Sequence, residues 1–170
     1  MTSSKSVRSV NVQCLRIRNS PVALYRIPES VLVIVYTDDA EVLLLKRSAP
    51  FEFWQSVTGS LEIDELACEA AVRELFEETG LANEGQLYNA DRCRNFTIDP
   101  RWRKRYAPGV TENTEHEWHF RLPAPCNVQI DDAEHSECQW VPINEAINRV
   151  WSWTNKDALR MLQAELRTTP

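Results

Sequence analysis

The stretch "GSLEIDELACEAAVRELFEETGL", which runs from Gly59 to Leu81, decides the fold of this chain. Its second part predicts a helix from Glu65 to Thr79, and Gly80 ends it because glycine readily adopts the left-handed conformation that stops a helix. Three glutamates crowd this helix: Glu74, Glu77 and Glu78. Like charges three or four positions apart cost a helix roughly 0.2–0.5 kcal/mol per pair. The pattern therefore raises the question of what offsets this repulsion.

The two faces of the helix suggest an answer. At 100° per residue, the apolar stripe that we expect to face the core comprises Cys68, Val72, Leu75, Phe76 and Thr79. The three glutamates are expected on the opposite side, flanked by the small residues Ala67, Ala70 and Ala71. Carboxylates that converge where neighbouring side chains leave room favour a hard divalent cation such as Mg²⁺, which takes oxygen ligands. A solvated acidic helix is the alternative.

The whole stretch resembles the Nudix box, a motif with fixed places over 23 residues. Those places are filled by Gly59, Glu65, Arg73, Glu74, Leu75, Glu77, Glu78, Gly80 and Leu81. The resemblance implies an α/β/α sandwich that hydrolyses a nucleoside diphosphate linked to another moiety, with Mg²⁺ or Mn²⁺ as the metal. No serine, cysteine or histidine nucleophile is then required.

The resemblance also implies roles for residues of the box and for one outside it. The metal-facing acids would be Glu74, Glu77, Glu78 and, in the later segment "AEHSE", Glu134, joined by the backbone carbonyl of Thr58. Glu65 and Arg73 would form a structural salt bridge, and Gly59 would let the backbone approach the metal. The general base would be either Glu74 or Glu134.

Three further segments resemble one branch of the Nudix family, whose substrate is dihydroneopterin triphosphate. These segments are Phe53–Ser60, Arg105–Glu115 and Ser152–Asn155. The branch implies hydrolysis to the monophosphate and pyrophosphate, a step towards folate, with dATP and other nucleoside triphosphates as additional substrates. The implied substrate contacts are Arg26, Arg47, Thr58, Thr97, Ile98, Asp99, Pro100 and Ser152. A general dNTP or dinucleoside polyphosphate hydrolase is the alternative, and a catalytically silent ligand-binding module is a more distant one.

Length and charge bound the remaining classes. The chain has 170 residues, 43% of them hydrophobic, which suits one domain with a sizeable core. We expect residues 1–24 to form an extension, polar or of transit-peptide type, and residues 25–170 to form the Nudix domain. The net charge of −6 disfavours general nucleic-acid binding. The sequence does not predict an oligomeric state.

Cysteine usage and hydropathy bear on location. The five cysteines are scattered singly, which indicates reduced thiols in a cytoplasmic protein rather than a disulfide framework or zinc finger. The longest apolar run, Val31–Tyr36, is too short to span a bilayer, so no membrane association is expected. His116 and His119 stand three apart on an expected strand, where they point to opposite faces and make a poor metal chelate.

The remaining pattern predicts the α/β or α+β class, with a mixed sheet and helices on both faces. The expected strands are Val31–Tyr36, Glu41–Arg47, Phe53–Gly59, Gln86–Phe96, Glu115–Leu122 and Cys138–Ile143. The expected later helices cover Asn144–Trp151 and Asn155–Arg167.

Two further features of the sequence concern ligand contact. The basic segment "RWRKRY" is either a phosphate-facing patch or a solvated loop; its cations are Arg101, Arg103, Lys104 and Arg105. Among the tryptophans, Trp102 and Trp118 could stack on a purine or pterin ring. A packing role is expected for Trp140, Trp151 and Trp153.

Overall fold

The computed structural model describes residues 25–168, so the expected extension of residues 1–24 lies outside the described residues. The strands and helices follow one another along the chain in this order: β1 (Glu29–Thr37), β2 (Glu41–Arg47), β3 (Phe53–Gln55), β4 (Val57–Ser60), α1 (Ala67–Thr79), β5 (Gln86–Thr97), the 3₁₀ helix η2 (Arg103–Arg105), β6 (Glu112–Leu122), β7 (His135–Pro142), α2 (Ile143–Arg149) and α3 (Trp153–Thr168). The division of the chain into an extension and a Nudix domain stays a prediction.

One mixed seven-stranded sheet organises the fold, in the order β3-β2-β1-β6-β5. β1 runs parallel to β6 and antiparallel to β2. The first half of β1 also pairs with β4, with Val31 opposite Gly59, and β2 also pairs with β7. The central position of β1 explains its continuous apolar run, because both of its faces are buried.

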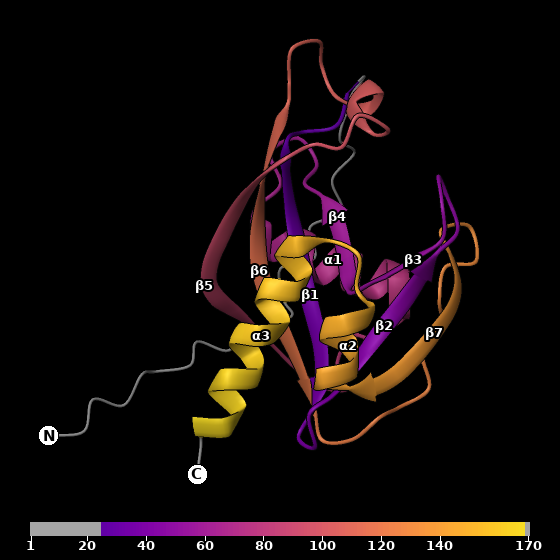
Figure 1. Cartoon of the computed structure of the whole chain (residues 1–170), viewed down its shortest axis with the longest axis vertical. Helices are drawn as coiled ribbons and strands as arrows, with labels where there is room; N and C mark the ends of the chain where they lie inside the picture. The colour runs from indigo at the N-terminus through magenta and orange to yellow at the C-terminus, as the bar shows by residue number, and fades with distance from the viewer. Residues whose placement is uncertain (1–24, 169–170) are drawn as a thin grey trace, which may run out of the picture.

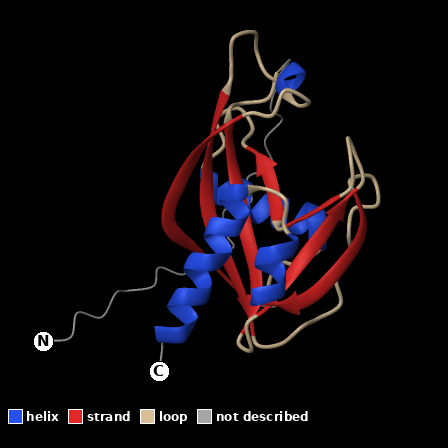
Figure 2. Cartoon of the chain, viewed as in Figure 1, coloured by secondary structure: helices blue, strands red, loops and turns tan. Residues whose placement is uncertain are grey.

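Helices cover both faces of the sheet (Figure 1). On one face, alternate β1 residues such as Val33 pack with Ala70, Ala71 and Leu75 of α1. On the other face, Ile34 and its even-numbered neighbours pack with α2 and α3. The prediction of a mixed sheet between helices is therefore confirmed. Figure 2 shows that the β5–β6 connection, which contains η2, extends beyond the end of the sheet.

The element boundaries differ modestly from those expected. The strand expected over Phe53–Gly59 is divided into β3 and β4, because β3 pairs with β2 whereas β4 pairs with β1. The helix of the box begins at Ala67 rather than Glu65. Glu69 fixes this start, since its carboxylate accepts a hydrogen bond from the Leu66 N–H at 3.0 Å. Gly80 ends the helix with a φ of 72°, as predicted.

The expected orientation of α1 is right for Leu75 and Thr79 but wrong for Phe76 and Glu78. Its buried residues are Ala70, Ala71, Leu75, Glu78 and Thr79, whereas Phe76 is 58% exposed. The two alanines let the helix approach β1 and β4 closely, and this rotates Glu74 and Glu78 towards the strands. Only Glu77 of the three acids keeps a side chain that is largely exposed, at 55%. The acidic residues therefore belong partly to the inner face of the helix.

Within residues 25–168, no helix combines the length and apolar character that crossing a bilayer requires. Cys68, Cys93, Cys126 and Cys138 are all free thiols, as the scattered cysteine pattern predicted for these positions; Cys14 lies outside the described residues.

Candidate active site

Arg73 ties the loop before α1 to the helix. Its guanidinium makes a bidentate pair with Glu65, with both N–O distances at 2.8 Å. The same side chain donates to the Ser60 carbonyl at 3.0 Å and contacts Glu74 at 2.7 Å and Glu77 at 3.1 Å. The expected ion pair between Glu65 and Arg73 is thus present. It fixes the end of β4 against α1, which places the acids of the helix beside the strand.

Glu74 lies directly against Gly59 of β4. A Cβ atom built on Gly59 would lie 1.8 Å from the carboxyl carbon of Glu74, so only glycine leaves the space that this carboxylate occupies. Burial raises the pKa of Glu74 to about 7; Arg73 opposes the rise, and Glu78 and Glu77 add to it. Glycine in the box therefore makes room for an acid of the same box.

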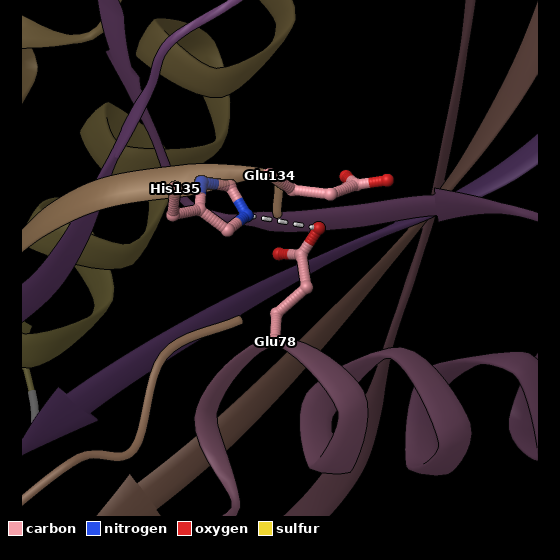
Figure 3. A group of neighbouring side chains, drawn as sticks. All are labelled: Glu78, Glu134 and His135. Carbon is pink, nitrogen blue, oxygen red and sulfur yellow. Dashed lines mark ion pairs between the residues drawn. The ribbon is translucent and has the colours of Figure 1, made fainter. Parts of the chain in front are cut away.

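Glu78, Glu134 and His135 form a group of potential metal ligands, which we call the acidic group (Figure 3), and their ligand atoms lie within 4.8 Å of one another. Glu78 rises from α1, and the other two residues precede and begin β7. His135 Nε2 lies 3.3 Å from a Glu78 oxygen, and His135 Nδ1 has no hydrogen-bond partner. The Thr58 N–H also donates to Glu78 at 3.3 Å. Glu74 and Glu77 contact Arg73 instead of joining this group.

The electrostatics of this group suit a divalent cation. Burial raises the pKa of Glu78, Glu134 adds to the rise, and His135 and Thr58 oppose it. Two carboxylates and an imidazole match Mn²⁺, and the oxygen ligands alone match Mg²⁺. A bound cation would offset both the burial of Glu78 and its repulsion by Glu134. The residues present therefore fit a divalent metal.

A cavity of about 470 Å³ opens beside the acids, between β1, β6 and the start of α3. Three of its lining residues are Arg26, Arg47 and Arg105. Arg47 donates to Glu134 at 2.9 Å, and the Arg26 N–H donates to the Arg105 carbonyl at 2.8 Å. Burial lowers the pKa of Arg105, and Arg26 and Arg47 lower it further. Three guanidinium groups thus gather where an anion would relieve their repulsion.

The cations of the basic segment "RWRKRY" do not all take the same role: one faces the cavity, where it could contact phosphate, and the others lie outside it. Arg105 lines the cavity, whereas Arg101 pairs with Asp99 and lies 4.1 Å from the centre of the Phe51 ring. Arg103 donates to the Ile98 carbonyl, and Lys104 is exposed. One cation of the segment therefore faces the cavity.

Aromatic rings form one wall of the cavity. Phe53, Trp102 and Trp151 line it and pack against one another, with ring centroids 5.3–6.1 Å apart. Trp153 also lines it and is 58% exposed, so the packing role expected for Trp153 is wrong, whereas Trp151 packs as expected and lines the cavity as well. These two residues lead into α3, whose first turn faces the cavity.

Trp118, in contrast, is 4% exposed and belongs to the core beneath α1. It does not line the cavity, so the expectation that it could stack on a ligand is wrong as well. Its place on β6 explains this, because even-numbered residues of that strand face α1.

The other expected substrate contacts are mostly at the cavity. Thr58, Thr97, Ile98, Asp99 and Ser152 line it, and Pro100 does not. Ser152 also caps α3, since its hydroxyl accepts a hydrogen bond from the Asn155 N–H at 3.1 Å.

Sequence reasoning missed several residues of the site. His135 was overlooked as a ligand, although it directly follows Glu134. Asn113 and Glu115 line the cavity from β6, yet both are more than nine-tenths buried. Their signal is alternation along "ENTEHEWH", where polar residues two apart share a face.

Comparison with known proteins places this site in a family, because residues 26–162 match the NUDIX domain. The chain belongs to the Nudix family. The prediction of a Nudix hydrolase from the box is confirmed at this level, and use of a divalent metal is a general property of these enzymes.

Individual relatives narrow the comparison. The Nudix chain is 41% identical over 140 residues to the dihydroneopterin triphosphate diphosphatase of Escherichia coli strain K12, covering 80% of this chain and 92% of the relative. It is 36% identical over 151 residues to the Haemophilus influenzae protein of the same name, covering 84% and 92%. The solved structure of the E. coli dihydroneopterin triphosphate pyrophosphohydrolase superposes with a TM-score of 0.78 at 36% identity, covering 84% of this chain and 99% of that one.

A Caenorhabditis elegans Ap4A hydrolase complex superposes with a TM-score of 0.66 at 25% identity, covering 84% and 100%. The E. coli and H. influenzae relatives named dihydroneopterin triphosphate diphosphatase confirm the resemblance to that branch in sequence, and the E. coli structure confirms it in structure.

Proposed function

We propose that this chain hydrolyses dihydroneopterin triphosphate to dihydroneopterin monophosphate and pyrophosphate, with Mg²⁺ or Mn²⁺ as the metal. One observation carries the proposal: a single cavity joins a cluster of three arginines to an aromatic wall, and Arg47 links it to Glu134 of the acidic group. This combination suits a triphosphate that bears a planar ring. The relatives named above are the second support.

The arginines would hold the phosphate chain. Arg26, Arg47 and Arg105 present guanidinium groups that can each form paired hydrogen bonds to phosphate oxygens. Their charge would attract an anionic substrate to a chain whose net charge is −6. The Thr58 hydroxyl donates to the Val31 carbonyl at 2.9 Å, so this hydroxyl hydrogen is already engaged within the protein. Thr58 would therefore shape the cavity wall from β4 rather than donate that hydrogen bond to the substrate.

The acids would bind the metal, and one of them would accept a proton from the attacking water. Glu78, Glu134 and His135 are the residues grouped to bind a cation, with Glu74 beside them. When bound, Mg²⁺ supplies charge to neutralise phosphate oxygens and makes water more acidic. Glu74 and Glu134 are the two carboxylates proposed as general base. Arg73 positions Glu74, and Arg47 positions Glu134.

We propose that the chain acts in the cytoplasm, and the four free thiols among residues 25–168 support this proposal, because thiols stay reduced there. A second candidate function is hydrolysis of dinucleoside polyphosphates or dNTPs, including dATP. The similarity to the Ap4A hydrolase structure favours this candidate.

The two candidates are separated by pyrophosphate release in the presence of Mg²⁺. We expect kcat/KM for dihydroneopterin triphosphate to exceed the values for dATP, the other dNTPs and diadenosine tetraphosphate. A higher value for a dNTP or for the dinucleotide would replace the first candidate with the second. Failure to hydrolyse any of them with Mg²⁺ or Mn²⁺ would refute both.

A further inference from the structure

The cavity contains polar atoms that the protein itself leaves unpaired. Within residues 25–168, six buried side-chain nitrogen or oxygen atoms lack a hydrogen-bond partner. Three of these atoms belong to residues that line this cavity: Glu115 Oε1, Asn113 Oδ1 and Gln55 Nε2. An unpaired buried polar atom is costly unless a ligand or water completes it. Their concentration in one cavity therefore points to a ligand.

Glu115 differs from the structural carboxylate two residues further along the same face of β6. Glu117 is fully buried, and both of its oxygens are paired, with Arg92, Arg94 and His119. Glu115 is 6% exposed and one of its oxygens has no partner. A carboxylate buried only for stability would be expected to resemble Glu117. Glu115 instead keeps an acceptor free at the cavity.

The surroundings of Glu115 hold it in place without satisfying it. A hydrogen bond from Thr154 and the charge of Arg94 oppose the effect of burial, which raises the pKa of Glu115 to about 7, and Glu117 adds to that rise. Asn113 is fixed by donating to the Ser30 hydroxyl at 2.7 Å, which leaves its oxygen unpaired. The unpaired oxygens of Glu115 and Asn113 thus have fixed positions on one face of β6. Two N–H groups of a ligand could donate the hydrogen bonds that these oxygens lack.

We propose that Glu115, with Asn113 and Gln55, recognises the 2-amino-4-oxopyrimidine edge of the substrate ring. That edge, shared by pterins and guanine, presents an N–H and an amino group as adjacent donors and a carbonyl oxygen as an acceptor. The two unpaired acceptors and the unpaired donor of the cavity match it in kind and number. The aromatic wall of Phe53, Trp102 and Trp151 suits the flat face of the same ring.

The same arrangement disfavours adenine. Adenine presents an amino donor beside a ring nitrogen with a lone pair, and that lone pair would face the carboxylate oxygen. A site built around hydrogen bonds to particular groups rejects analogues that lack them, because its buried polar atoms then stay unpaired. Glu115 would therefore set the preference among triphosphates that the arginines bind alike.

The test uses selectivity rather than activity alone. This inference rests on the proposed function, so kcat/KM is measured for dihydroneopterin triphosphate, dGTP and dATP with the full chain and its metal. We expect Glu115→Gln to lower the ratio of the dihydroneopterin value to the dATP value by about 10- to 100-fold, the range for a hydrogen bond to a charged group. The ratio of kcat/KM for dGTP to kcat/KM for dATP should fall by a similar factor. Glu112→Gln, an exposed change on the same strand, should leave both ratios unaltered.

Binding separates failure of the inference from failure of the proposed function. Neopterin, which has the ring but no phosphates, is titrated by calorimetry into wild type and both variants. Weaker neopterin binding by Glu115→Gln, without the same change in Glu112→Gln, supports ring recognition even if no triphosphate is hydrolysed. An unchanged selectivity ratio together with unchanged neopterin binding overturns the role of Glu115. An equal loss for all three triphosphates with unchanged neopterin binding also overturns it. Asn113→Ala provides a second variant should Glu115→Gln fail to fold, and the same outcomes apply to it.

Discussion

The carboxylate of Glu74 occupies the space where a side chain on Gly59 would stand, with a hypothetical Cβ only 1.8 Å from the carboxyl carbon. Gly59 belongs to β4 and Glu74 to α1, so the contact defines how closely helix and strand approach. Its consequence is that any larger residue at position 59 must displace an acid of the candidate active site.

Gly59→Ala should therefore lower both activity and stability. We expect unfolding free energy to fall by about 1–3 kcal/mol, the usual cost of overpacking. Denaturant unfolding of Gly59→Ala, Glu74→Ala and the double variant measures the coupling. The cost of Gly59→Ala should be smaller in the Glu74→Ala background, where the clash is absent. Equal costs in both backgrounds would show that the contact does not explain the glycine.

Arg105 and Lys104 provide a matched pair for testing the arginine cluster. Arg105 lines the cavity, whereas its neighbour Lys104 is exposed and does not. We expect Arg105→Ala to raise KM for a triphosphate substrate by about 10-fold or more, since a hydrogen bond between charged groups is lost. Lys104→Ala should leave KM unchanged. Steady-state kinetics at two salt concentrations checks this, and similar effects of both variants would indicate only a diffuse charge effect.

The site residues that the sequence could identify are those whose spacing is itself the signal. Residues three and four apart on a helix must lie together, so the spacing alone identifies Glu74 and Glu78 as neighbours. Their burial does not follow from it, because the apolar periodicity makes Phe76 look like core. The backbone approach that two alanines permit decides the orientation instead. Such an approach depends on the strand opposite, which local sequence does not describe.

The residues of β6 were hidden for a different reason. Polar side chains at alternate positions of a strand normally face water, so Asn113, Glu115 and Glu117 suggest an exposed face. Here that face is buried, and Arg92 and Arg94 come from β5 to neutralise Glu117. The partners are more than 20 residues away in the chain. Only the register between the two strands brings them together.

The acids should differ in metal affinity according to their positions. Glu78 and Glu134 share the group with His135, whereas Glu77 is mostly exposed and pairs with Arg73. We expect Glu78→Gln to reduce kcat/KM by more than about 100-fold, beyond the usual loss of an outer-shell partner. Glu134→Gln should weaken Mn²⁺ binding, and raised Mn²⁺ should partly restore its activity. Glu77→Gln should have the smallest effect on binding.

Electron paramagnetic resonance titration with Mn²⁺ measures affinity independently of turnover, and chelation of the metal should abolish pyrophosphate release. Normal Mn²⁺ affinity in Glu78→Gln would contradict the assignment of that residue. An inactive Glu134→Gln with normal affinity would instead identify Glu134 as the general base.

Glu117 should make the fold sensitive to acid. Burial alone would raise its pKa, but hydrogen bonds from His119, Arg92 and Arg94 outweigh burial and lower the pKa to about 2. A carboxyl whose pKa is lower in the folded state stabilises the protein above its unfolded pKa, and this stability is lost as pH falls towards 2. Lowering a pKa by one corresponds to about 1.4 kcal/mol of stability, so the contribution of Glu117 is on the order of 3 kcal/mol.

Urea unfolding of wild type and Glu117→Gln at several pH values between 2 and 6 tests this sign. The variant should be less stable at pH 6, because Arg92 and Arg94 lose their buried partner. Its unfolding free energy should also change less steeply below pH 4.5 than that of wild type. Glu112→Gln, exposed at the start of the same strand, should retain the wild-type slope. Parallel curves for wild type and Glu117→Gln would mean that Glu117 is not the group whose protonation weakens the fold.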